Sequence, residues 1–175
     1  VRYQLVGSVR FYQRREIKDA LAYLRLIYNP DDEISLLRII NVPSRLIGDR
    51  TIEQLRGWAG RQGLSMGWAL LRLAELAEQK TGEGARIGSV ALRRLTDFGI
   101  LLARARAALP EQTLTALLRQ VMEDTGYIES LRDGTEEGEE RISNVRELFS
   151  AVERYDGISA GEALATFLEE VALVS

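Results

Sequence analysis

Apolar residues recur at steps of three and four along almost the whole chain, and this spacing constrains the fold more than any other feature of the sequence. Such a period places apolar side chains on one face of an α-helix, whereas a half-buried strand needs alternation in steps of two. The predicted inward positions are Ile17, Ala20, Leu21, Leu24 and Ile27; Ile34, Leu37 and Ile40; Ile52, Leu55 and Ala59; Leu92, Leu95, Phe98, Leu102 and Ala105; Leu114, Leu117, Leu118 and Val121; Ile142, Val145, Phe149, Val152 and Tyr155; and Leu164, Phe167, Leu168 and Val171. The sequence therefore predicts an all-α fold, a multi-helix bundle with short loops.

Helix boundaries follow from proline, glycine and small polar residues. Asn29 is predicted as an N-cap with Pro30 at the first helical position, and Pro110 is predicted to open a later helix. Gly63 and Gly126 are predicted to close helices. The Gly-containing stretch near residues 80–85 is the most natural internal boundary, and the segment 133–140 is predicted to be an acidic loop.

Two local features remain open at this stage. After Ser65, a predicted cap, the favoured inward set is Met66, Leu70, Leu73 and Ala77, and the competing set is Trp68, Leu71 and Ala74. The first residues, Tyr3 to Val6, alternate like one isolated strand, which has no stability without partners. Because the chain begins at Val1 and stops on an apolar run, we expect it to be a piece of a larger protein.

Several kinds of chemistry are excluded by composition. The 175 residues include no Cys and no His, which removes Ser-His-Asp and Cys-His catalysis and nearly every structural zinc site. No Walker-type phosphate loop, GxGxxG or HExxH motif occurs. The carboxylates of 133–140 lack the ligand alternation of an EF-hand. We therefore expect no catalytic residue, no metal site and no cofactor in this chain.

Charge is distributed unevenly along the chain, whose net charge is −3. Residues 1–62 hold eleven basic and seven acidic side chains, a balance of +4, which leaves −7 for the remainder. A basic front third on an acidic body indicates an anionic partner on one side. There is no apolar run near the length of a membrane span and no signal peptide, so we expect a cytoplasmic protein without membrane contact.

The stretch from Val42 to Leu55 reads as a turn that leads directly into a helix. Pro43 cannot continue the preceding helix, and Gly48 lets the backbone approach a partner closely. Either Asp49 or Thr51 is predicted as the cap, the latter with capping-box spacing to Gln54. A helix N-terminus attracts anions because its first N–H groups have no partner within the helix.

Arg45 and Arg50 flank this predicted anion seat with positive charge. Lys18 and Arg25 are seven residues apart, so they project from one side of an earlier helix. The alternative interpretation is an ordinary helix corner with solvated cations, and an Asp49 carboxylate acting as the cap would compete with a phosphate for the same donors.

Three segments resemble superfamily 1 DNA helicases of the UvrD/PcrA/Rep type. The first and most specific is VGSVRFYQRREIKDALAYLRL at residues 6–26; the second is LRIINVPSR followed by IGDRT at 37–45 and 47–51; the third is FLEEVAL at 167–173. The resemblance spans nearly the whole chain in the right order. It implies a junction or hinge at residues 1–15, with Gly7 and Ser8 as the hinge pair, and a helical 2B subdomain at 16–172.

The resemblance also implies a function. In that family the 2B subdomain swivels relative to the ATP- and Mg-dependent core domains and contacts duplex DNA at the fork, without sequence specificity, in enzymes that unwind DNA 3′–5′ for repair and replication. Carried over, those contacts fall on the turn residues Ile47, Gly48 and Thr51 and on the helix cations Lys18 and Arg25. Leu46 stands where a glycine of the turn is expected, Ser8 replaces the second hinge glycine, and Gln13 stands where an acid is common.

Two other classes of function remain. The chain could be a protein-interaction module of the same helicase, in which the acidic half at 111–170 docks a repair or transcription protein and DNA is not touched. A self-contained all-α enzyme is disfavoured by the missing His, Cys and nucleotide motifs.

Overall fold

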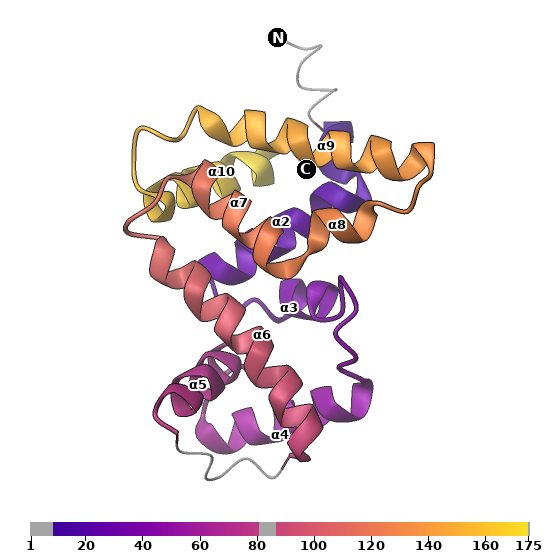
Figure 1. Ribbon diagram of the computed structural model, residues 1–175. Coiled ribbons are helices and arrows are strands. Elements are labelled where there is room, and N and C mark those ends of the chain that lie inside the picture. The colour runs from indigo at the N-terminus through magenta and orange to yellow at the C-terminus, as the bar shows by residue number, and fades with distance from the viewer. Residues whose placement is uncertain (1–8, 81–86, 175) are drawn as a thin grey trace.

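Helix α6 (Ser89–Ala108) is the longest described element and extends between two groups of helices (Figure 1). The computed structural model describes residues 9–80 and 87–174. One group, called the lower lobe, contains α4 (Asp49–Gln62), α5 (Met66–Glu78) and the N-terminal half of α6. The other, the upper lobe, contains α2 (Arg15–Tyr28), α7 (Leu114–Thr125), α8 (Tyr127–Leu131), α9 (Glu136–Glu153) and α10 (Ala160–Val174), and the short α3 (Glu33–Ile39) lies between the lobes. Within the described ranges every regular element is helical, so the all-α prediction is confirmed.

The predicted apolar stripes form most of one continuous core. In α2 all five predicted positions are at most 1% exposed, because this helix is packed against α3, α6, α7, α9 and α10. In α6 the core positions are Leu95, Phe98, Leu102 and Ala105, while Leu92 is only partly buried. After Ser65 the favoured set is confirmed at Met66, Leu70 and Leu73, but Ala77 is exposed and Ala74 is buried instead.

Two glycines allow backbones to meet in the lower lobe. A Cβ built on Gly99 of α6 would lie 2.2 Å from the carbonyl oxygen of Leu70, so a side chain there would separate α5 from α6. A Cβ on Gly67 would lie 2.0 Å from the carbonyl oxygen of Pro30, in the connection between α2 and α3. These contacts hold α5 against α6 and against the connection between α2 and α3.

The predicted start of α3 was wrong. Asn29 does not cap a helix; its Oδ1 accepts from the N–H of Asp31 at 3.0 Å, which stabilises a turn. The N-cap is Asp32, whose Oδ1 accepts from the N–H of Ser35 at 3.0 Å and whose Oδ2 accepts from the Ser35 hydroxyl at 2.8 Å. Pro30 is buried in the turn rather than placed at the first helical position.

The later start also changes which face of α3 is buried. Leu36 and Ile39 face the core, and Ile40 follows them as a buried C-cap. The predicted core residues Ile34 and Leu37 are 86% and 43% exposed. The prediction was wrong here because a seven-residue helix is too short for its apolar spacing to define one phase.

Two other boundaries differ from the prediction. Pro110 lies in a turn, and α7 begins at Leu114 after Thr113, whose hydroxyl accepts from the N–H of Ala116 at 3.2 Å. Five of the eight residues of the predicted acidic loop 133–140 are helical, because α9 begins at Glu136 with Thr135 as its cap. Its early glutamates favour a helix N-terminus.

The predicted helix ends at glycine are confirmed. Gly63 and Gly126 have φ values of 68° and 70°, the left-handed conformation that closes a helix. The predicted strand over residues 3–6, the hinge pair Gly7 and Ser8, and most of the boundary near 80–85 lie outside the described residues.

Candidate nucleic-acid interface

The turn between α3 and α4 is held by the Asn41 side chain, which forms two hydrogen bonds with the backbone of one residue, as a neighbouring strand would. Asn41 Nδ2 donates to the carbonyl oxygen of Ile47 at 2.6 Å, and Asn41 Oδ1 accepts from the Ile47 N–H at 2.9 Å. The Ile47 side chain is buried, so it anchors the turn in the core rather than facing a ligand. The Val42–Pro43 peptide bond within the turn is cis.

Arg45 points inward from the turn. Its Nη1 donates to the carbonyl oxygens of Ile39 and Ile40 at 2.7 and 3.0 Å, and its Nη2 donates to the hydroxyl of Tyr23. The guanidinium carbon also lies 4.4 Å from the ring centre of Phe98 on α6. Its guanidinium therefore closes the C-terminus of α3 and links the turn to both lobes.

Leu46 projects outward between these two anchored neighbours. Its side chain is 67% exposed, and its φ of 57° lies in the left-handed region. The Nη1 of Arg94, from α6, donates to the Leu46 carbonyl oxygen at 3.1 Å. Arg94 was not singled out from the sequence, because nothing in the chain signals that residue 94 returns to residue 46.

The N-terminus of α4 follows the turn and is open. Gly48 is the N-cap, with no side-chain cap and no atom within 4 Å of where a Cβ would stand. Neither predicted cap, Asp49 or Thr51, has that role, so the Asp49 carboxylate does not occupy the donors. No described residue accepts from the N–H of Asp49, Arg50 or Thr51, and the first hydrogen bond of the helix joins the Ile52 N–H to the Gly48 carbonyl oxygen at 3.0 Å.

Arg50 and Thr51 stand on the first turn of α4. Arg50 is exposed and forms no hydrogen bond or ion pair with any described residue, whereas Thr51 is half-buried. Arg50 belongs to the turn of helix that carries the open N–H groups, and Arg94 is bonded to the carbonyl oxygen of Leu46, two residues before Gly48. This arrangement suits an oxyanion such as a phosphate.

Lys18 and Arg25 line a second basic site. They face a hollow of about 250 Å³ whose walls also include Leu21, Ile34 and Arg38. Arg38 is held there by Asp19, with an Nε–Oδ1 distance of 3.0 Å, while Lys18 is exposed and Arg25 half-buried. The structure brings the two predicted helix cations together at this hollow, whose walls include no residue of the turn at 41–48.

Buried tyrosines connect the surroundings of the two sites. The Tyr23 hydroxyl donates to the Val42 carbonyl oxygen at 2.6 Å, and the Tyr127 hydroxyl donates to Asp19 Oδ2 at 2.7 Å. The two rings meet edge to face with centres 6.4 Å apart. Burial raises the pKa of Tyr23, and burial together with the bond to Asp19 raises the pKa of Tyr127. Both phenols are neutral at physiological pH and act as fixed donors.

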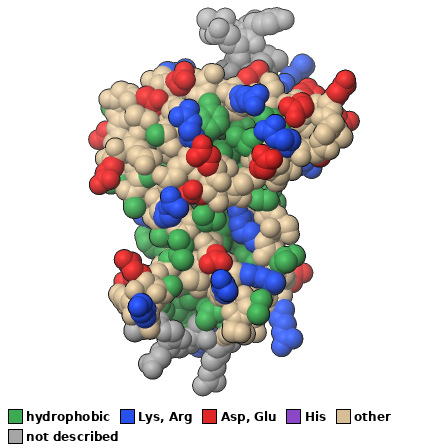
Figure 2. All heavy atoms as spheres, viewed as in Figure 1, with side chains coloured by type: hydrophobic (Ala, Val, Ile, Leu, Met, Phe, Trp, Pro, Cys, Tyr) green, Lys and Arg blue, Asp and Glu red, His purple; other side chains and the backbone are tan. Residues whose placement is uncertain are grey.

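Acidic side chains are most frequent at one end of the upper lobe, whereas basic side chains lie on both lobes. On the face in Figure 2, Asp and Glu gather near the upper-lobe tip formed by α8 and α9, and Lys and Arg lie both among them and at the lower right. The first turn of α9 contains Glu136, Glu137 and Glu139. This end of the upper lobe is therefore acidic, and the expected anionic partner on one side of the molecule stays a prediction.

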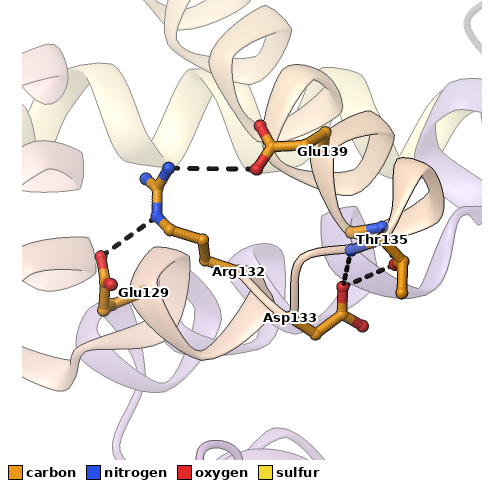
Figure 3. A network of polar contacts seen from close by, with 6 residues as sticks. Glu129, Arg132, Asp133, Thr135 and Glu139 are labelled. Atoms are coloured by element: carbon orange, nitrogen blue, oxygen red, sulfur yellow. Dashed lines mark hydrogen bonds and ion pairs between the residues drawn. The ribbon is translucent and has the colours of Figure 1, made fainter.

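Two carboxylates of the acidic segment after α8, those of Asp133 and Glu139, have partners close in the chain (Figure 3). Asp133 Oδ1 accepts from the N–H of Thr135 at 3.0 Å and from its hydroxyl at 2.5 Å, and these bonds lower the pKa of Asp133. Arg132 lies between Glu129 and Glu139, at 3.4 and 4.0 Å. Across residues 9–80 and 87–174 no cluster of three or more Asp or Glu side chains is arranged to hold a metal ion. None of the helices in these ranges is long and apolar enough to cross a membrane.

Comparison with known proteins supplies the family. The model for the UvrD-like helicase C-terminal domain matches residues 1–175. The chain is 32% identical over 174 residues to ATP-dependent DNA helicase PcrA of Bacillus subtilis, covering 99% of this chain and 22% of that protein. It is 35% identical over 188 residues to ATP-dependent DNA helicase UvrD1 of Mycobacterium tuberculosis and 34% identical over 175 residues to DNA helicase II of Escherichia coli. These alignments cover 99% and 98% of this chain but only 24% and 23% of those proteins, so the chain spans less than a quarter of the relatives it matches.

Proposed function

The chain belongs to the UvrD-like helicase C-terminal domain family, and we propose that it is the helical 2B subdomain of an ATP-dependent 3′–5′ DNA helicase. In this role it contacts duplex DNA at the fork junction and swivels relative to the core domains. ATP hydrolysis, with its Mg²⁺, belongs to those core domains, because this sequence has no phosphate-loop motif. The proposal also places the parent enzyme in the cytoplasm, acting in DNA repair and replication; the names of the relatives, ATP-dependent DNA helicase PcrA and DNA helicase II, support the helicase activity alone.

One observation carries the proposed DNA contact: the α4 N-terminus is uncapped, open and accompanied by two arginines. A phosphate at Gly48 accepts from the N–H groups of the first turn, and Arg50 and Arg94 supply the charge. All these donors read backbone rather than bases, so binding is independent of sequence and sensitive to salt.

Arg45 and Ile47 have supporting roles in this proposal. Their side chains are engaged inside the protein, where they hold the turn in the shape that exposes the amides. Direct phosphate contact then falls on Arg50, Thr51 through its N–H group, and Arg94. In this division, phosphate is bound by groups that have no hydrogen-bond partner inside the protein, or whose guanidinium has nitrogens that are not used in an internal bond.

Lys18 and Arg25 form a second phosphate contact, on either strand of the same duplex. Their hollow of about 250 Å³ can hold a phosphate group with a few water molecules. Arg38, although paired with Asp19, adds donors at the rim. α3 carries Arg38 and also leads into the turn, so one short helix separates the two contacts.

Binding of a labelled duplex to the 175-residue chain, followed by fluorescence anisotropy across a salt series, tests the proposal. The expected dissociation constant is on the order of 10⁻⁴ to 10⁻⁶ M at physiological salt and tighter at low salt. Arg50→Ala and Arg94→Ala should each weaken binding roughly fivefold or more at low salt, and each should reduce the log–log salt slope by about 0.9. Lys18→Ala with Arg25→Ala should act in the same direction.

Arg146→Ala is the matched control. Arg146 lies on α9, is exposed and has no described partner, so its removal changes net charge equally without touching either contact. If Arg146→Ala weakens binding as much as Arg50→Ala, attraction is only general and the assigned contact is wrong. If no duplex binds even at low salt, the protein-interaction alternative is favoured, with the acidic end of α8 and α9 as the docking surface.

A further inference from the structure

The two hydrogen bonds of Asn41 both go to one residue of the turn, and they fix the peptide planes on either side of that residue. Asn41 Oδ1 accepts from the Ile47 N–H at 2.9 Å, and Asn41 Nδ2 donates to the Ile47 carbonyl oxygen at 2.6 Å. Both backbone polar groups of Ile47 therefore point toward the Asn41 side chain. The Ile47 side chain is buried, so the residue between the two peptide planes is anchored in the core as well.

The geometry of a trans peptide then sets the direction of the groups next to Ile47. In a trans peptide the carbonyl oxygen and the N–H point in opposite directions. Within residues 9–80 and 87–174 the only cis peptide bond is Val42–Pro43, so both peptides of Ile47 are trans. The Leu46 carbonyl oxygen and the Gly48 N–H consequently both point away from Asn41, to the same side of the turn.

Arg94 lies on that side of the turn. Its Nη1 donates to the Leu46 carbonyl oxygen at 3.1 Å, while its Nε and Nη2 form no hydrogen bond with any described residue. The Gly48 N–H likewise donates to no described residue, and Gly48 is exposed. An unpaired amide donor and a guanidinium with unused donors thus share one side of the turn, and these are the groups that bind phosphate oxygens.

Gly48 by itself permits the opposite arrangement as well. Rotating the Ile47–Gly48 peptide plane by about half a turn would move the φ of Gly48 from −75° to about 105°, a value that glycine accepts and other residues disfavour. The Gly48 N–H would then point toward Asn41, and the Ile47 carbonyl oxygen would point away from it. An oxygen in that place repels a phosphate, so one orientation of this peptide suits DNA and the other opposes it.

We propose that Asn41 is a positioning residue that holds the Ile47–Gly48 peptide in the orientation that suits a phosphate, an inference that rests on the proposed duplex contact. The bond from Asn41 Nδ2 to the Ile47 carbonyl oxygen stabilises this orientation, because rotation of the peptide would break it. Asn41 itself touches no phosphate. Its loss leaves every cation of the contact in place and allows the peptide to rotate.

A double-mutant cycle, measured by fluorescence anisotropy of a labelled duplex, tests this positioning role. Asn41→Ala removes both bonds, and Gly48→Ala disfavours the rotated orientation while its Cβ meets no protein atom within 4 Å. Asn41→Ala should weaken binding about fivefold or more in the chain with Gly48, but less than about twofold in the Gly48→Ala background. The salt dependence should be the same with and without Asn41, because no charge is removed.

Asn29→Ala is the matched control. Asn29 also holds a turn, through its bond to the Asp31 N–H at 3.0 Å, and its removal should leave duplex binding unchanged. Circular dichroism checks that each variant is folded. NMR spectra of the unsubstituted chain give a second measurement that needs no variant. The Ile47 N–H should be protected from solvent exchange, and the Gly48 N–H resonance should shift when duplex is added.

An equal effect of Asn41→Ala in both backgrounds overturns the positioning role and leaves the duplex contact intact. Duplex binding without a shift of the Gly48 N–H resonance overturns it in the same way. A loss of affinity from Asn29→Ala as large as that from Asn41→Ala also overturns it, since binding would then follow the stability of turns in general. Absence of duplex binding by the unsubstituted chain at low salt overturns the proposed function and the positioning role together.

Discussion

Replacing Arg45 by Met would show whether Arg45 stabilises the turn or contacts DNA directly. The substitution keeps most of the aliphatic stem and removes three hydrogen bonds from a charged donor, two to carbonyl oxygens of α3 and one to Tyr23, together with the stacking on Phe98. Bonds from charged donors contribute about 1.5–3 kcal/mol each when buried, and a cation–π contact about 0.5–2 kcal/mol.

Partial exposure reduces this sum, because water can reach the carbonyl oxygens that Arg45 leaves. Arg45 is half-buried, so we expect Arg45→Met to lower the free energy of unfolding by about 2–4 kcal/mol. Arg45→Lys should be intermediate, since an ammonium keeps the charge but cannot reproduce the planar fork. Arg50→Ala should change stability by less than about 0.5 kcal/mol, because Arg50 is exposed and has no described partner.

Urea unfolding measures the stability, and the salt dependence of duplex binding measures the contact. Under conditions where Arg45→Met is folded, the slope of its log binding constant against log salt concentration should equal that of the unsubstituted chain. In Arg50→Ala the magnitude of this slope should be smaller by about 0.9. A variant at position 45 that is fully stable, yet loses about 0.9 of the slope, would refute the reasoning. Arg45 would then leave its internal partners to bind phosphate, as the sequence alone suggested.

Two further predictions concern the core. Gly99→Ala should lower the free energy of unfolding by about 1–3 kcal/mol, since its Cβ would lie 2.2 Å from the backbone oxygen of Leu70. Gly60→Ala is the control: this glycine is helical, exposed and has open space around it, so the free energy of unfolding should rise by about 0.5–1 kcal/mol. Equal effects of the two changes in urea unfolding would disprove the close approach. The pKa of Tyr127 is raised from 10.0, so the folded state retains a proton that the unfolded chain loses above about pH 10. The free energy of unfolding should therefore be unaffected below that pH and should fall above it by up to about 1.4 kcal/mol per pH unit. In Tyr127→Phe the fall measured by urea unfolding across this pH range should be shallower.

The sequence was sufficient for the helical class and for several local features. Long apolar stripes placed α2 and α6 correctly, and Gly63 and Gly126 marked helix ends, because periodicity and the left-handed C-cap are decided within a few residues. The family likeness was also visible in the residues, and the comparisons confirm the UvrD-like family. Local signals failed where they were shortest: the seven residues of α3 did not define a phase, and Pro110 did not mark a helix start.

Within the candidate site, the sequence predicted the turn and the helix that follows it, but it did not predict that the helix N-terminus lacks a side-chain cap, nor the roles of the side chains around it. Arg45 and Arg50 read alike in the chain, yet one is bonded to α3 and Tyr23 while the other faces solvent. Arg94 joins the turn from 48 residues away. Helix formation depends on neighbours within one or two turns, which any sequence displays directly. The partner of a guanidinium depends on which distant segments pack beside it, and that is decided only when the whole core has formed.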